Sequence, residues 1–433
     1  MDDRLIAIDR WTSESQAYFL THLHADHTRG LSPGWRRGPI FCSRVSATLF
    51  PSKFPGFDLS LIKALEIGRT YSFTLKSLSS DQSVQYRVTP IDACHCPGAV
   101  MFLFNGDFGK VLYTGDFRWE TKGNRAQMAK YMLLRALGKD KVDFLHVDNT
   151  FCHPSFSFPP REVAAQQVVD IISSYPKHDI LIGIDTLGKE DLLVHISHAL
   201  NTKIWVWPER LQTMHLLGFD DVFTTKTCLA RVRAVPRYSL TIDTLEALNT
   251  VKPTIGIMPS GLPWSVTMFN SNKHSRDPSF AVTLHLDKDQ LNSPQRFHRY
   301  VYSVPYSEHS CFNEIGEFIR LVQPFDMSGI VTSSFCYINP RHHFGHLCGA
   351  YQLLGHSWDN LEKHELFEKT EFMQIGSVSR CRDSKMGRNK KRALRNYCSG
   401  VRRSRVSLVR RERRGVKIIE DGFCASDLNT GIT

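Results

Sequence analysis

The segment Thr21–His27 places four possible metal ligands within six consecutive residues, directly after the apolar run AYFL. In an extended segment His22 and His24 point to the same side, because side chains alternate with a period of two. Asp26 and His27 lie on the following turn and can reach a second ion. Imidazole and carboxylate groups suit zinc or similar ions, but this loop alone cannot complete two coordination shells. The chain must therefore fold so that ligands from distant segments meet this strand end.

Two further candidate ligands also follow apolar, strand-like runs. They are His95 in the string DACHCPG and Asp116 in the string YTGDFR. A carboxylate at Asp116 can bridge two ions. Two metal ions about 3.5–4 Å apart polarise a phosphoryl oxygen, generate hydroxide from water at neutral pH and stabilise the leaving oxygen. The pattern therefore favours hydrolytic chemistry without a redox cofactor.

Other cysteines and histidines leave alternative metal sites open. Cys94 and Cys96 flank His95, so a C-x-C zinc site is one alternative. We expect both cysteine side chains to point away from His95 into the protein, where a free cysteine behaves as a small buried hydrophobe. The segment Arg341–Cys348 holds three histidines and a cysteine but lacks the second ligand pair of a zinc finger. Loop histidines are the simpler interpretation there.

Short apolar runs separated by turn residues predict strands in the first 150 residues. These strands are expected at 5–9, 17–22, 86–93, 100–104, 110–116 and 144–149. Most of the runs end in a polar cluster that contains Asp or His. Residues at strand ends can converge on one rim of a sheet, where loops carry chemistry.

From Pro160 the pattern changes to an alternation of helix and strand. Helices are expected at 161–175, 187–200 and 209–219, and strands at 179–185, 203–207 and 254–260. Alternating units predict a parallel sheet flanked by helices. A strand at 299–307, a helix at 311–324 and a strand at 329–334 follow, and this order is lost after about residue 345.

The net charge of +11 is concentrated near the end of the 433-residue chain. Residues 376–417 contain 16 Lys and Arg against only Asp383 and Glu412, which is a local balance of +14 and leaves −3 for the remainder. Clustered cations bind phosphate chains by releasing counterions, so we expect a flexible tail that binds DNA or directs nuclear import. No run approaches eighteen apolar residues and no secretory leader is visible, so no membrane association is expected.

The strings HLHADH, HCPG and TGDFR resemble the metal motifs of the metallo-β-lactamase fold in its β-CASP branch, the DNA nucleases of the Artemis and Apollo type. Similarity in AIDRW, LSPGW, VDNTFC, TLGKE and PYSEHS extends from about residue 4 to 335, and LSPGW favours the Apollo side. The resemblance implies an α/β fold, an αββα sandwich with an inserted β-CASP domain of alternating β and α units. The implied segments are 1–159 for the first part of the sandwich, 160–298 for the insert, 299–345 for the return segment and 346–433 for the tail.

The resemblance also implies roles for individual residues. His22, His24, His95 and Asp116 correspond to ligands of one ion, and Asp26, His27 and the bridging Asp116 to ligands of the other. Asp9 corresponds to a carboxylate that supports the loop. Asp148 and His309 correspond to the β-CASP acidic and histidine motifs, expected at the second metal or the scissile phosphate. The candidate catalytic residues are therefore Asp26, Asp116, Asp148 and His309.

From the residues alone, His309 and Asp148 have plainer interpretations. His309 lies at a strand-to-helix turn, where with Ser310 it can simply cap the helix. Asp148 precedes Asn149 and Thr150 and can be an ordinary turn aspartate.

The substrate has to be inferred from turns that can face phosphate. Lys189 lies where a strand joins a helix, so N–H groups at the helix start can hold a phosphate there, although a surface lysine is an alternative. Ser260 is a possible donor, and Trp264 can stack on a base or pack in the core. With Ser307 and Ser310 these donors would form the pocket that the family uses for a terminal 5′-phosphate. Arg118 can contact the nucleic-acid backbone or pair with a nearby acid.

The sequence therefore predicts a metal-dependent DNA nuclease with one or two divalent ions, zinc before others. The resemblance implies a 5′-to-3′ exonuclease on 5′-phosphorylated single-stranded or overhanging DNA. Its setting would be DNA repair, interstrand cross-link repair or telomere maintenance in the nucleus, with repair or telomere proteins as partners. An RNA-processing β-CASP endonuclease and a non-enzymatic chromatin scaffold are the alternatives.

Overall fold

The computed structural model describes residues 5–11, 14–76, 83–261, 292–331 and 338–350, which all lie in the compact unit Met1–Asp359. Trp264 and the basic segment 376–417 fall outside these residues. Among the described helices, none combines the length and the apolar character that crossing a membrane requires.

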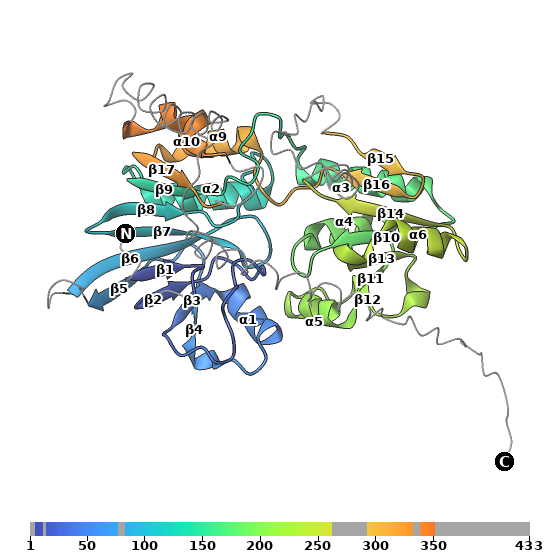
Figure 1. The fold of residues 1–433 in the computed structure, drawn as a ribbon, viewed down its shortest axis with the longest axis horizontal. Coiled ribbons are helices and arrows are strands. Elements are labelled where there is room, and N and C mark those ends of the chain that lie inside the picture. Colours follow the sequence, from blue (N-terminus) through green and yellow to red (C-terminus); the bar gives the residue numbers. More distant parts are fainter. Residues whose placement is uncertain (1–4, 12–13, 77–82, 262–291, 332–337, 351–433) are drawn as a thin grey trace, which may run out of the picture. The chain divides into compact units, whose positions relative to one another are not determined.

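The first two sheets form a sandwich (Figure 1). One sheet is parallel, in the order β1 (Ile6–Ile8), β2 (Ala17–Phe19), β3 (Ile40–Ser43), β4 (Ile62–Leu65). The other has the order β17 (Asp326–Gly329), β9 (Phe144–Val147), β8 (Gly109–Tyr113), β7 (Val100–Gly106), β6 (Ser83–Asp92), β5 (Tyr71–Lys76). Phe19 of the first sheet packs edge-on against Phe102 and Phe104 of the second, with ring centroids 5.2 and 5.1 Å apart. This aromatic layer is the apolar core between the sheets.

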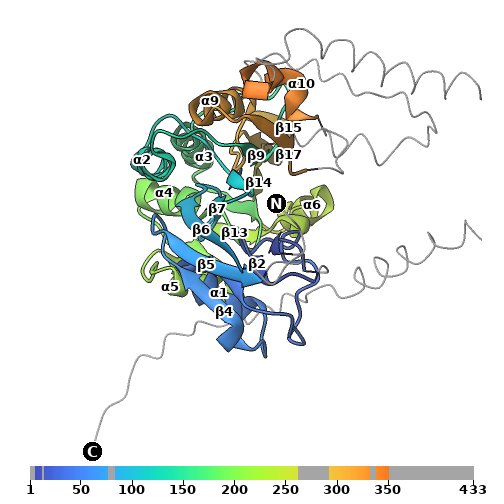
Figure 2. The same ribbon diagram turned by 90° about the vertical axis from the view of Figure 1, so that its left-hand side faces the viewer.

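Helices cover the outer faces of the sandwich. α1 (Arg44–Lys53) contacts β3 and β4, while α2 (Asn124–Leu137) and α9 (Phe312–Val322) lie at the opposite side (Figure 2). In α9 the residues Ile315, Phe318, Ile319 and Val322 are buried, which is the spacing of one helix face. A short helix, α10 (Pro340–Phe344), follows β17. The αββα sandwich predicted for the fold class is confirmed.

The inserted part has a third sheet with seven strands. Its order is β12 (Phe223–Thr224), β11 (Ile204–Trp205), β13 (Val232–Pro236), β10 (Asp179–Ile184), β14 (Thr254–Pro259), β16 (Val301–Val304), β15 (Gln295–His298), with only β15 antiparallel. The helices are α3 (Arg161–Ser174), α4 (Glu190–Leu200), α5 (Pro208–Leu216) and α6 (Ile242–Asn249). Every residue of β10 is buried, as expected for a parallel strand covered on both faces.

Strand pairing corrects two of the predicted boundaries. The predicted end of the insert at 298 would separate β15 from β16. However, β16 pairs with β14 inside the third sheet, so this sheet reaches Val304. The strand predicted to begin at 329 begins earlier, at Asp326, and after Gly329 the Ile330 N–H continues the bonding to the Val147 carbonyl, while 332–334 lie outside the described residues. The polar sequence DMSG of β17 carries no apolar strand pattern, because the strand lies at the edge of its sheet.

Candidate metal centre

The predicted ligands come from loops that follow separate strands. The His22–His27 loop follows β2, His95 lies in the turn between β6 and β7, and Asp116 follows β8. Gly115 allows the loop that carries Asp116 to lie close to Thr21. It has a φ of +54°, and a Cβ placed on it would lie 2.8 Å from the Thr21 side chain.

The Asp116 carboxylate lies at the centre of the histidines. Its Oδ2 is 3.5 Å from His22 Nε2 and 3.6 Å from His95 Nε2, and its Oδ1 is 3.3 Å from His27 Nε2. The exposed Asp26 reaches the same histidine, with Oδ2 at 3.6 Å from His27 Nε2. The two oxygens of Asp116 thus face two different groups of nitrogens, as a bridging carboxylate would.

Backbone carbonyls fix the tautomers of His24 and His95. His24 Nε2 lies 3.0 Å from the Leu187 carbonyl oxygen, and His95 Nδ1 lies 2.8 Å from the Glu308 carbonyl oxygen. A carbonyl oxygen only accepts, so these two ring nitrogens carry the hydrogen. The lone pairs of His24 Nδ1 and His95 Nε2 then face each other at 3.1 Å. Two lone pairs at this distance repel unless a cation lies between them.

Asp9 fixes the other two histidines of the loop. It accepts the Thr21 N–H at 2.9 Å and the Thr21 hydroxyl at 2.6 Å, so the Thr21 oxygen can accept from His22 Nδ1 at 3.0 Å. Asp9 Oδ2 also accepts from His27 Nδ1 at 2.7 Å. His22 Nε2 therefore presents a lone pair to the centre, and His27 Nε2 does so once its ring is neutral. His22 Nε2 is buried and has no hydrogen-bond partner among the described residues.

His309 approaches the centre from the turn between β16 and α9. Its ring lies 4.7 Å from that of His95, and its Nδ1 donates to Asp148 Oδ2 at 2.8 Å. Asp148 is held in turn by the N–H and hydroxyl of Thr150, at 3.0 and 2.6 Å. His309, His95 and Asp116 form one of three ligand groups that the described residues contain.

Burial keeps His22 and His95 neutral, whereas at His27 burial is outweighed by the charges of Asp116 and Asp9, which raise the pKa to about 12, so a metal ion bound there would displace a proton. Burial, followed by the charge of His27, lowers the pKa of His22 well below its usual value, and burial and His309 lower the pKa of His95 to about 3. Burial raises the pKa of Asp116, but His27 and His309 outweigh it and hold that pKa well below its usual value. Neutral imidazole and ionised carboxylate are the forms that bind a metal.

These residues fit divalent metal ions. A buried ring nitrogen without a partner, two opposed lone pairs and a central carboxylate are the donors that zinc and related ions use. His22, His24, His95 and Asp116 would hold one ion. His27 and Asp116 lie together with His22, and His309 lies with His95 and Asp116, so these residues could contribute to a second ion.

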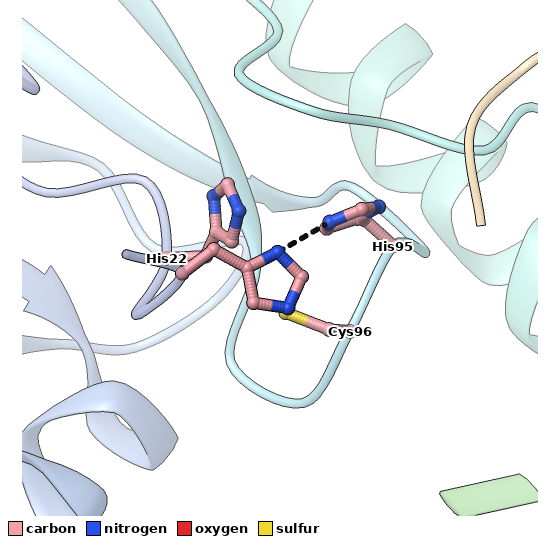
Figure 3. A group of neighbouring side chains, drawn as sticks. His22, His95 and Cys96 are labelled. Atoms are coloured by element: carbon pink, nitrogen blue, oxygen red, sulfur yellow. Dashed lines mark hydrogen bonds between the residues drawn. The ribbon is translucent and has the colours of Figure 1, made fainter. Parts of the chain in front are cut away.

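Cys96 corrects one expectation from the sequence. Its side chain does not point away from the histidines, because one ligand atom each of Cys96, His22, His24 and His95 lie within 4.8 Å of one another (Figure 3). The cause is Cys94, whose φ of +54° breaks the alternation of an extended segment. Cys94 itself is buried and belongs to none of the ligand groups among the described residues, so the two cysteines form no C-x-C site there.

Comparison with known proteins finds similar DNA repair enzymes. A family profile described as DNA repair metallo-beta-lactamase matches residues 219–334. The 5′ exonuclease Apollo of Gallus gallus is 35% identical over 336 residues, which cover 77% of this chain and 63% of that protein. This chain is therefore similar to DNA repair metallo-β-lactamases over most of its length.

Two other relatives match a similar part of the chain. The 5′ exonuclease Apollo of Rattus norvegicus is 36% identical over 335 residues, 76% of this chain and 54% of that protein. The DNA cross-link repair protein SNM1 of Arabidopsis thaliana is 32% identical over 320 residues, 71% of this chain and 59% of that protein. The alignments thus span between about half and just under two thirds of these curated relatives.

The residues predicted to hold phosphate form hydrogen bonds and ion pairs within the chain. Lys189 is buried, and its Nζ lies 3.1 Å from Glu308 Oε2 and 3.2 Å from Asp185 Oδ2. Its own N–H donates to Glu308 Oε1 at 2.7 Å. The anion at the start of α4 is therefore the side chain of Glu308, a residue that the sequence analysis did not single out.

Ser307 and Ser310 are also buried, and their hydroxyls bond to backbone. Ser307 Oγ donates to the His309 carbonyl at 2.8 Å, and Ser310 Oγ donates to the Phe117 carbonyl at 3.1 Å. Arg118 is 1% exposed and donates to the Ser307 carbonyl and to Glu314. These contacts hold the turn that carries His309. Ser260 is partly exposed at the end of β14, where its N–H donates to the Val304 carbonyl.

Proposed function

We propose that this chain is a metal-dependent 5′ exonuclease that hydrolyses phosphodiester bonds of DNA. The observation that carries the proposal is the convergence of imidazole lone pairs on Asp116, because such a set binds divalent cations and has no other evident use. The names of the similar proteins, 5′ exonuclease Apollo and DNA cross-link repair protein, supply the substrate class.

We expect zinc at this centre, with His22, His24, His95 and Asp116 around one ion and Asp26, His27 and Asp116 around a second. Bound ions there would polarise a phosphoryl oxygen and lower the pKa of a bound water. Asp9 would maintain the orientation of the loop histidines through Thr21 and His27.

His309 and Asp148 act as a pair in this proposal. Burial lowers the pKa of His309, but the charges of Asp148 and Asp116 outweigh it and raise this pKa to about 9. With Nδ1 donating to Asp148, the His309 ring is oriented so that Nε2 faces the centre. There it can serve the second metal or hold a proton beside the scissile phosphate.

The finer parts of the function rest on the resemblance. We propose 5′-to-3′ polarity on 5′-phosphorylated single-stranded or overhanging DNA, with Ser260 near the terminal phosphate. We also propose a nuclear role in repair or telomere maintenance, with the basic segment 376–417 as a DNA tether or import signal.

A product ladder tests this function directly. End-labelled single-stranded DNA with and without a 5′-phosphate, and RNA of the same sequence, would be digested with and without a chelator. We expect shortening of phosphorylated DNA from its 5′ end that the chelator stops. Preferential internal cleavage of RNA would instead support the β-CASP endonuclease alternative, and binding without cleavage would support the chromatin scaffold.

His24→Ala and Asp116→Ala test the site itself. Each should abolish cleavage, because each removes a donor from the shared centre, while the circular dichroism spectrum remains that of the folded chain. Full activity in both variants would remove the proposed centre.

A further inference from the structure

The turn Thr186–Lys189 of the inserted part contacts a histidine of the metal centre through a backbone carbonyl. The Leu187 carbonyl accepts from His24 Nε2, while the flanking carbonyls of Thr186 and Gly188 face the opposite way and accept from Arg210 of α5. Arg210 is 1% exposed and also pairs with Glu190 at 2.8 Å. Arg210 thus holds the residues on both sides of Leu187, whose own carbonyl binds the histidine.

The same turn binds Glu308, whose carbonyl accepts from His95. The N–H of Lys189 and its ammonium each bind one oxygen of the Glu308 carboxylate, at 2.7 and 3.1 Å. The close approach requires Gly188, which has a φ of +103° and whose added Cβ would lie 2.6 Å from Glu308 Oε1. Lys189 itself has a φ of +63°. Successive positive φ values turn backbone N–H groups toward an anion, and here that anion is an internal carboxylate.

We infer that Lys189, Glu308 and Arg210 are positioning residues that hold the tautomers of His24 and His95 for the metal. The inference rests on the proposed metal centre. The ring N–H groups of His24 and His95 both donate to carbonyls of one unit, formed by the turn Thr186–Lys189 and Glu308. The ring N–H groups of His22 and His27 are held by Asp9 instead, through Thr21 and directly. Partners of this kind typically change metal affinity by about 10- to 100-fold when they are removed.

Lys189→Met and Lys110→Met in the full-length chain form a matched pair for the test. Both lysines are 8% exposed and both pair with an acid, but Lys110 pairs with Asp140 at 2.7 Å, away from the ligands. The affinity for Zn²⁺ alone is measured by competition with a chromophoric chelator. The visible spectrum of the Co²⁺-loaded protein reports the geometry around the ion.

Lys189→Met is expected to weaken Zn²⁺ binding about 10- to 100-fold and to alter the Co²⁺ spectrum. Lys110→Met should change neither the Zn²⁺ affinity nor the Co²⁺ spectrum, even if it lowers the unfolding temperature as much as Lys189→Met does. Glu308→Gln should lose less affinity than Glu308→Ala, because the amide oxygen can still accept the Lys189 N–H. This conservative pair keeps the test valid if Lys189→Met does not fold.

Equal Zn²⁺ affinity and equal Co²⁺ spectra in the two lysine variants would overturn the inference. A loss of DNA affinity in Lys189→Met with unchanged metal binding would also overturn it, in favour of a phosphate contact. Absence of Zn²⁺ binding by the wild-type chain would instead remove the proposed metal centre, and the inference with it.

Discussion

At the scale of single residues, the site depends on the groups that accept a hydrogen bond from the ring N–H that each histidine directs away from the metal centre. Thr21 links Asp9 and His22 with one hydroxyl group, which donates to Asp9 and accepts from His22 Nδ1. Thr21→Val keeps the volume but removes both bonds, so we predict roughly tenfold weaker Zn²⁺ binding. Thr21→Ser keeps the hydroxyl and should restore most of the affinity. Indistinguishable affinities of the Val and Ser variants by chelator competition would contradict this role.

At the scale of elements, the turn that carries His95 is docked on the first turn of α1. The hydroxyls of Ser43 and Ser46 donate to the Gly98 carbonyl at 2.6 and 3.1 Å, and a Cβ on Gly98 would lie 2.7 Å from Ser46 Oγ. Gly98→Ala should therefore cost clearly more than the roughly 1–3 kcal/mol of backbone strain alone. Gly56→Ala is the control, because Gly56 has a similar φ of +79° but open space around it. Equal urea midpoints for the two variants would refute the docking.

A second contact between elements gives stability a pH dependence. Arg161, at the start of α3, binds both Glu120 and the Cys94 carbonyl, with its Nη2 2.8 Å from Glu120 Oε2. Burial raises the pKa of Glu120, but Arg161 outweighs it and lowers this pKa below 4.5. The stabilisation is thus complete above pH 4.5 and is lost as the pH falls through the lowered value. Glu120→Gln should cost more free energy of unfolding at pH 7 than at pH 3.5 in urea titrations. A constant difference would exclude this linkage.

At the scale of the whole molecule, charge separates a nearly neutral part from a basic one. Deletion of residues 376–433 removes the segment 376–417 with its balance of +14 together with three acidic residues, a net charge of +11. We predict weaker DNA binding with a shallower dependence on salt, because fewer counterions are released. Metal-dependent hydrolysis of a small phosphodiester should persist. Loss of this hydrolysis in a folded, truncated chain would place part of the chemistry in the tail.

The convergence of loops that carry possible ligands could be predicted, because strand ends and ligand types are local patterns, whereas the sandwich followed from the resemblance. His22, His95 and Asp116 each follow an apolar run, and the sheets bring those ends together. The contact between Lys189 and Glu308 could not be predicted, because the two residues are 119 positions apart and nothing local marks that pairing. Cys96 was misplaced because a left-handed residue at Cys94 breaks the period of two. Such errors arise where tertiary contacts decide which way a side chain faces.

The central claim is that inward lone pairs around Asp116 hold the divalent ions that cleavage requires. The most direct measurement titrates Zn²⁺ into the metal-stripped full-length chain while bound metal and the shortening of 5′-phosphorylated DNA are followed in the same samples. The account predicts that cleavage is absent at the start and rises in proportion to bound metal. Full cleavage by the stripped chain, before any metal is added, would contradict it.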